Sequence, residues 1–178
     1  MLNFLKRNKD YEVIDNFLDK TDFLKIQKSF LDNMSCSWHM SDGISETGSS
    51  DGVYFIHFLF FDNKIQSNKY SDVFPIMEKL KIKHPERIKV NLYTKSDTLV
   101  KHGSHVDSGI SKKGCIFYLN TNDGFTILDG DIGIKSIENR LLIFDPKKPH
   151  SSTNCTDRNY RSTINFNYFD LHTNKTDI

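Results

Sequence analysis

The feature that most constrains the fold is a period-two alternation of apolar and polar residues in the second half of the chain. In the segment 87–94, one face carries Ile88, Val90 and Leu92, and the other carries Lys89, Asn91 and Tyr93. The last segment of this kind sets Ile164, Phe166 and Tyr168 against Arg161, Thr163, Asn165 and Asn167. Because side chains alternate between the two faces of a strand, each segment is predicted to be a half-buried β-strand.

Turn residues divide this half of the chain into short segments. They occur at Gly103, Gly109, Gly114, 122–124, 129–133 and Asn139. Short strands at such spacing favour a sandwich or a barrel. The apolar faces can pack on N-terminal helices while the polar faces line an interior, and a polar interior in a small barrel indicates a binding site.

The first half of the chain is predicted to be mostly helical and connecting. Apolar spacing predicts a helix within 17–31, capped by Thr21 or Asp22, and a second helix through 73–80 that ends near Pro85. Between them, the Ser-, Gly- and Asp-rich segment 41–52 is a loop, interpreted either as a lid or as a plain surface loop, and 53–61 is a strand.

Composition limits the class of protein. The 178 residues fit one domain spanning 1–178. A formal charge of +1 gives no strong nucleic-acid signal, and no apolar run is long enough for a membrane span. Three cysteines without CxxC spacing predict neither a disulfide framework nor a zinc–thiolate site, which favours a cytoplasmic location.

One short motif has the spacing of a metal site. His105 and Asp107 are two residues apart, so on a strand both side chains project from one face. His150, after the strand 141–144 and its Asp-Pro turn, is the best-placed third ligand, whereas His102 lacks an acidic residue two positions later. Two histidines and one carboxylate leave open positions on a mononuclear iron.

A second pattern predicts a carboxylate receptor. Arg161 and Thr163 share the polar face of the last strand. The planar guanidinium of arginine binds a carboxylate through two parallel hydrogen bonds, and a neighbouring hydroxyl can bind a remaining lone pair.

The order HxD, distal His and Arg-x-Thr resembles the 2-oxoglutarate- and Fe(II)-dependent dioxygenases, in particular the small prolyl-4-hydroxylase-like members of phages and bacteria. The resemblance covers approximately residues 87–169 and includes the stretches IKVNLY, FYLNTNDGFT, NRLLIFD and INFNYF. It implies an α+β fold, with a double-stranded β-helix (jelly-roll or cupin-like) core and N-terminal helices packed on its major sheet. It further implies His105, Asp107 and His150 as iron ligands, Arg161 and Thr163 as the site for 2-oxoglutarate, and Tyr93, Asn91 and Tyr118 as further cosubstrate contacts.

By this resemblance the chain hydroxylates, or otherwise oxidises, a C–H bond with Fe(II), 2-oxoglutarate and O2, with ascorbate as a candidate reductant, and yields succinate and CO2. The primary substrate stays open between a peptidyl residue such as proline, a nucleobase and a small molecule, because recognition resides in variable loops. The alternative is a cupin-like metal-binding module without turnover. A zinc hydrolase is disfavoured because it would leave Arg161 and Thr163 without a role.

Overall fold

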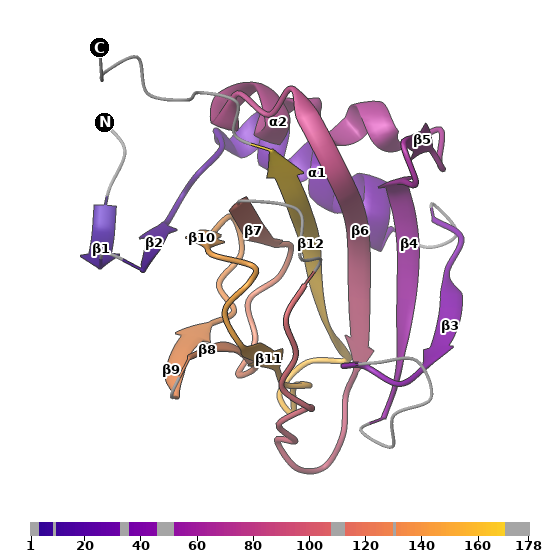
Figure 1. Cartoon of the computed structure of the whole chain (residues 1–178). Helices are drawn as coiled ribbons and strands as arrows, with labels where there is room; N and C mark the ends of the chain where they lie inside the picture. Colours follow the sequence, from indigo (N-terminus) through magenta and orange to yellow (C-terminus); the bar gives the residue numbers. More distant parts are fainter. Residues whose placement is uncertain are drawn as a thin grey trace.

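The computed structural model describes residues 4–8, 10–32, 36–45, 52–107, 113–129 and 131–169. Its strands form a major sheet in the order β1-β2-β10-β7-β12-β6-β4-β3, with β5 paired to β4, and a smaller sheet in the order β11-β8-β9 (Figure 1). The strands are β1 (Phe4–Asn8), β2 (Tyr11–Ile14), β3 (His39–Asp42), β4 (Val53–Phe61), β5 (Lys64–Ile65), β6 (His84–Thr94), β7 (Lys113–Tyr118), β8 (Phe125–Leu128), β9 (Ile132–Lys135), β10 (Leu141–Phe144), β11 (His150–Ser152) and β12 (Tyr160–Phe169). All pairings between these strands are antiparallel.

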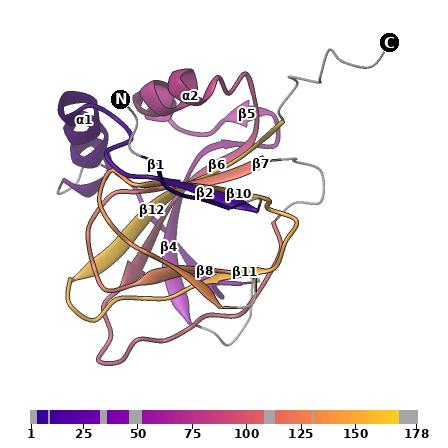
Figure 2. The same cartoon turned by 90° about the vertical axis from the view of Figure 1, so that its left-hand side faces the viewer.

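The helices cover the outer face of the major sheet, while the smaller sheet lies on the opposite face (Figure 2). They are α1 (Lys20–Leu31) and α2 (Phe74–Leu80), the latter preceded by a 3-10 turn, Tyr70–Val73. Helix α1 buries Phe23, Ile26 and Phe30, which its helical period places on one side. These pack in one core with apolar residues of the sheet, among them Ile88, Val90, Phe117, Ile164 and Phe166. The predicted outward faces of the two long strands are therefore observed.

A second core lies between the two sheets. It contains Tyr11 and Val13 of β2, Ile116 and Tyr118 of β7, Leu128 and Ile134 of the smaller sheet, and Leu142 and Phe144 of β10. Packing of two inner faces in this way leaves the polar inner face of β6 and β12 at one end of the barrel. That end holds the candidate site.

Several details of the N-terminal half differ from the prediction. Strands β1 and β2 precede the first helix, and β2 joins the major sheet by pairing with β10. Helix α1 is capped by Asp19, whose carboxylate accepts a hydrogen bond from Asp22 N at 3.0 Å, and not by Thr21 or Asp22. Helix α2 ends at Leu80 and is followed by Lys81 in a left-handed conformation (φ 57°), and Pro85 lies within β6 instead of at the helix end.

The predicted loop 41–52 is partly a strand. Its first two residues belong to β3, which pairs with β4, so the start of this segment is fixed at the edge of the major sheet. Residues 46–51, on which the lid interpretation depends, lie outside the described residues, as does the C-terminal segment from 170 onward.

Within the described residues, neither helix has the length or the apolar character needed to cross a membrane.

Candidate metal and cosubstrate site

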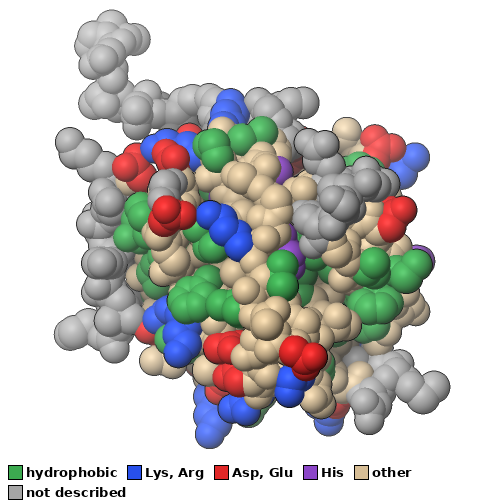
Figure 3. Space-filling model, turned by 90° about the horizontal axis from the view of Figure 1, so that it is seen from below, with side chains coloured by type: hydrophobic (Ala, Val, Ile, Leu, Met, Phe, Trp, Pro, Cys, Tyr) green, Lys and Arg blue, Asp and Glu red, His purple; other side chains and the backbone are tan. Residues whose placement is uncertain are grey.

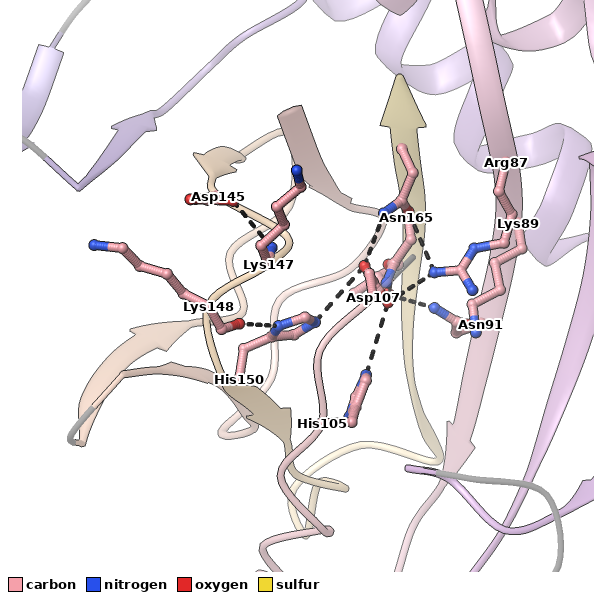
Figure 4. A network of polar contacts seen from close by, with 12 residues as sticks. Arg87, Lys89, Asn91, His105, Asp107, Asp145, Lys147, Lys148, His150 and Asn165 are labelled. Atoms are coloured by element: carbon pink, nitrogen blue, oxygen red, sulfur yellow. Dashed lines mark hydrogen bonds and ion pairs between the residues drawn. The ribbon is translucent and has the colours of Figure 1, made fainter. Parts of the chain in front are cut away.

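The three residues of the predicted metal motif converge at one end of the barrel. Their nearest ligand atoms all lie within 4.8 Å of one another. Asp107 Oδ1 is 3.9 Å from His105 Nε2, and Asp107 Oδ2 is 3.7 Å from His150 Nε2 (Figure 4). The sequence places these residues 45 positions apart, and the fold brings them together.

Backbone pairing positions the two histidines. His150 is the first residue of β11, and His105 forms an isolated antiparallel bridge with His150. The backbone N of each histidine lies 2.9 Å from the backbone O of the other. Asp107 follows without regular strand structure, and its N–H donates to Pro146 O at 2.9 Å. The expectation that His105 and Asp107 share one regular strand is therefore wrong, yet the extended segment still turns both side chains to the same point.

Hydrogen bonds orient the imidazole rings. His150 Nδ1 lies 3.0 Å from Lys148 O, and His105 Nδ1 lies 3.5 Å from Gly103 O. Because a carbonyl only accepts, Nδ1 of His150 is the donor, and the lone pair of a neutral ring is left on Nε2. Burial, reinforced by His150, lowers the pKa of His105 against the effect of Asp107, which favours the neutral ring that a metal requires.

Asp107 is held from the side by two residues of the neighbouring strands. Arg87 Nη2 donates to its Oδ1 at 2.7 Å, and Asn167 Nδ2 donates to its Oδ2 at 3.1 Å. Burial alone would raise the pKa of this carboxyl, but the charge of Arg87 and the hydrogen bonds from Asn167 and Arg87 together hold it below its ordinary value. The carboxylate is thus kept ionised and fixed in orientation.

Strands β6 and β12 supply the wall beside the metal triad. Their register pairs Arg87 with Asn167, Lys89 with Asn165, Asn91 with Thr163 and Tyr93 with Arg161. All eight side chains lie on the inner face because they alternate along each strand. The row of side chains begins beside Asp107 and runs away from it, and six of the eight line a cavity that His105, Asp107 and His150 also line.

Arg161 is buried at the far end of this wall. It is 1% exposed, donates through Nε to Ser136 Oγ at 2.7 Å and through Nη2 to Thr126 Oγ1 at 3.0 Å, and packs on the rings of Tyr93 and Tyr118. Within the described residues no carboxylate pairs with it. Its partners are neutral, so an anion in the cavity would compensate a charge whose burial is costly.

The other predicted residues also lie in the cavity wall. Thr163, Asn91 and Tyr93 line it, whereas Tyr118 is fully buried behind it and donates to Thr126 Oγ1 at 2.8 Å. Among the described residues nothing donates a hydrogen bond to the buried Oδ1 of Asn91, so this oxygen can accept one from a donor in the cavity. His102, the rival metal ligand, instead stacks on Tyr93 and bonds to Ser152 Oγ at 2.9 Å.

No role at the site was predicted for Arg87, Lys89 or Asn167, nor for Thr126 and Ser136 around Arg161. The signal for the first three was present, because the alternation places them on the polar inner face. No comparable signal marks Thr126 and Ser136, which reach Arg161 across sequence separations of 35 and 25 residues.

The arrangement fits both groups that the resemblance implies. Ligand atoms about 2.1 Å from one metal and at right angles to each other lie roughly 3 Å apart, so small side-chain rotations would close the observed spacing around an ion. Two imidazoles and one carboxylate suit non-haem iron with open positions. The buried guanidinium of Arg161 and the hydroxyl of Thr163, which line the same cavity, suit the carboxylate of an acid lying along the wall.

Comparisons with known proteins agree with the architecture. No protein-family model matches the chain, and a search of curated proteins finds no match. Solved structures do match, among them a prolyl hydroxylase from Trichoplax adhaerens in complex with a hypoxia-inducible-factor peptide fragment, at 15% identity and a TM-score of 0.67 over 93% of this chain and 88% of that one.

Two further structures are similar. A Pseudomonas putida prolyl-4-hydroxylase matches at 10% identity with a TM-score of 0.57, over 90% of this chain and 93% of its own. The non-haem α-ketoglutarate-dependent epimerase SnoN from nogalamycin biosynthesis matches at 12% identity with a TM-score of 0.60, over 90% and 78%. The expected α+β double-stranded β-helix fold, with helices on the major sheet, is confirmed.

Proposed function

We propose that this chain is a 2-oxoglutarate- and Fe(II)-dependent dioxygenase that oxidises a C–H bond of a primary substrate. The observation that carries the proposal is one cavity lined at one end by His105, Asp107 and His150 and at the other by the buried Arg161, which has no carboxylate partner among the described residues. A hydrolytic metal centre or a structural metal site would use the three metal ligands, but neither would explain the buried Arg161.

Each residue has a role in this proposal. His105, Asp107 and His150 hold the metal through Nε2, a carboxylate oxygen and Nε2. Arg161 binds the distal carboxylate of 2-oxoglutarate, with Thr163, Asn91 and Tyr93 as further polar contacts along the wall. When bound, iron with 2-oxoglutarate and O2 supplies the oxidising chemistry, with succinate and CO2 as coproducts. The protein fixes the geometry and limits access of water.

Similar folds host more than one outcome at the substrate carbon. Of the three matched structures named above, two are prolyl hydroxylases and one is an epimerase. Hydroxylation of a peptidyl prolyl residue is therefore one specific form of the proposal, and stereochemical inversion at a carbon is another. Both begin with removal of hydrogen from a C–H bond at the expense of 2-oxoglutarate and O2, and inversion additionally needs a reductant such as ascorbate, so the first test addresses the shared part.

The first test measures succinate and CO2 from 2-oxoglutarate with anaerobically iron-loaded protein exposed to air, with and without ascorbate. His150→Ala should lose both metal and turnover, and Arg161→Gln should retain metal but lose 2-oxoglutarate binding. Matched controls are His57→Gln and Arg140→Gln. His57 is a buried histidine bonded to Ser37 O and Ser67 Oγ, and Arg140 pairs with Asp15 through two hydrogen bonds.

Binding is measured alongside turnover, by titrating 2-oxoglutarate into Mn(II)-loaded protein without O2. If wild-type protein binds neither metal nor 2-oxoglutarate, or if Arg161→Gln binds 2-oxoglutarate as tightly as Arg140→Gln does, the proposal is wrong. Binding of both groups without succinate from any substrate tested would favour the cupin-like binding module.

A further inference from the structure

One cation of the cavity has no role in holding the metal or 2-oxoglutarate. Lys89 lies on the inner face of β6 between Arg87 and Asn91, and it lines the same cavity as His105 and Asp107. In register it lies opposite Asn165, which also lines the cavity and offers a side-chain amide. The pair therefore separates the residues that hold Asp107 from those assigned to 2-oxoglutarate.

The ammonium group of Lys89 has only weak partners. Its Nζ lies 3.3 Å from Tyr54 Oη and 5.5 Å from the centre of the Tyr54 ring. Within the part of the chain that the structure describes, no salt bridge joins it to a carboxylate. The carboxylate of the cavity, Asp107, is instead bound by Arg87 and Asn167. Burial, with Arg87 as the next cause, lowers the pKa of Lys89 to about 8, so the amine is mostly charged at neutral pH.

The charges around the cavity leave an excess of positive charge. Arg87, Lys89 and Arg161 are on the inner face, and Asp107 is the one carboxylate among the described residues that line the cavity. Divalent iron, Arg87, Lys89 and Arg161 would carry five positive charges against three negative charges on Asp107 and dianionic 2-oxoglutarate, so an excess of two positive charges remains. Arg87 is in contact with Asp107, and Arg161 would be in contact with the cosubstrate, so Lys89 is the cation left without a carboxylate in contact.

The position of Lys89 limits the size of what it can bind. Residues on one face of a strand repeat at about 6.6–6.8 Å, so Lys89 lies one such step from Arg87, which touches Asp107. A group bound to Lys89 would thus lie about one side-chain length from the metal ligands. Because 2-oxoglutarate would occupy part of the same cavity, a compact substrate fits better than a bulky one.

Resting on the function proposed above, we infer that Lys89, together with Asn165 and Tyr54, binds a carboxylate of the primary substrate, which is a small carboxylic acid oxidised a few atoms from that carboxylate. The ammonium donates to the carboxylate, and the amide of Asn165 donates from the opposite strand. Amino acids with a free carboxylate are members of this class. An internal peptide residue lacks the group.

The test pairs acids with their neutral amides. Proline, leucine, glutamate and aspartate, each beside its α-carboxamide, are titrated without O2 into Mn(II)-loaded, 2-oxoglutarate-saturated protein, and are assayed in air for stimulation of succinate formation. At least one acid should bind at least tenfold more tightly than its amide. Lys89→Met should weaken that acid about 10- to 100-fold, as expected for loss of a charged hydrogen bond, and Lys89→Arg should recover part of the affinity.

Lys95→Met is the matched control, since Lys95 is an exposed lysine just beyond the end of β6. It should bind the acid as wild type does. The inference is overturned if no acid binds more tightly than its amide, or if Lys89→Met weakens 2-oxoglutarate as much as it weakens the acid, which would make Lys89 a cosubstrate residue. Acid binding that depends on Lys89 in protein that forms no succinate would refute the oxygenase proposal and leave the carboxylate site standing.

Discussion

A methyl group added at Gly124 should displace the arginine of the proposed cosubstrate site without touching any polar atom of it. A Cβ built on Gly124 would lie 2.4 Å from the backbone oxygen of Asn154, 2.6 Å from Cδ of Arg161 and 2.9 Å from Oδ1 of Asn122. One of the obstructing atoms belongs to the backbone, so a change of rotamer cannot clear the space. Gly124→Ala therefore tests whether close packing fixes the position of the guanidinium.

The size of the effect follows from these contacts. Ordinary contact begins near 3.4 Å, so the Asn154 carbonyl must retreat by about 1 Å and the Arg161 side chain by about 0.8 Å. Overpacking of this kind costs about 1–3 kcal/mol, and weakening of the bond from Arg161 to Ser136 adds about 1 kcal/mol. We expect a loss of 2–4 kcal/mol in the free energy of unfolding and at least a tenfold loss of 2-oxoglutarate affinity.

The assay combines urea unfolding with anaerobic titration of 2-oxoglutarate into Mn(II)-loaded protein. Gly133→Ala is the control, because a Cβ there meets only the ring of Phe125, at 3.3 Å, on the exposed strand β9. It should change stability by less than about 1 kcal/mol and leave affinity unchanged. If Gly124→Ala matches Gly133→Ala in both measurements, packing at Gly124 does not position Arg161, and the reasoning fails.

Three further outcomes follow from the structure. Asn139→Ala should lower the free energy of unfolding, measured in urea, by about 2–4 kcal/mol. The buried Asn139 side chain accepts a hydrogen bond from Leu18 N at 2.9 Å and donates one to Leu18 O at 2.8 Å, and a loss below about 1 kcal/mol would contradict this prediction. Phe117→Ala should lower the free energy of unfolding by about 3–5 kcal/mol, since the ring is fully buried and packs edge-on against two other phenylalanines. A loss as small as that of substituting an exposed residue would argue against this core. Mn(II) at 100 times its dissociation constant should stabilise wild-type protein by about 2.7 kcal/mol in thermal unfolding, and Asp107→Asn should abolish the shift; an equal shift in the variant would place the metal elsewhere.

The parts of the fold that local patterns specify were predictable. The strands β4 and β10 begin and end at the predicted residues, and the faces of β6 and β12 are as expected for Ile88, Val90, Ile164 and Phe166. In each case an alternating or continuous apolar run is bounded by turn residues. Such signals are contained within the segment itself.

Long-range pairing explains most of what was missed. Strand β2 has four residues, and its place in the sheet depends on β10, more than 120 residues away. Pro85 was placed at a helix end because proline disfavours helix, yet it lies near the start of β6, where the register with β12 shifts. Neither placement can be read from a window of neighbouring residues.

The molecular surface agrees with the small net charge, since acidic and basic side chains are interspersed on the face seen from below, with histidine side chains visible near its middle (Figure 3). No field of one sign on this face would draw a polyanion. The positive charge that matters is inside the cavity and not on this surface. Electrostatic selection of the substrate is therefore expected at close range, after entry.

The site depends on a register that alternation alone cannot supply. The sequence shows which residues of β6 and β12 face inward, but sliding one strand by two residues would preserve both faces and change every partner. In the observed register, Arg87 and Asn167 meet at Asp107, and Lys89 falls between that pair and the residues around Arg161. A slip of two residues would set Lys89 opposite Asn167 and bring its amine toward the carboxylate, where its charge would be neutralised. The uncompensated lysine, and with it the inferred choice of an acidic substrate, is thus a consequence of strand pairing.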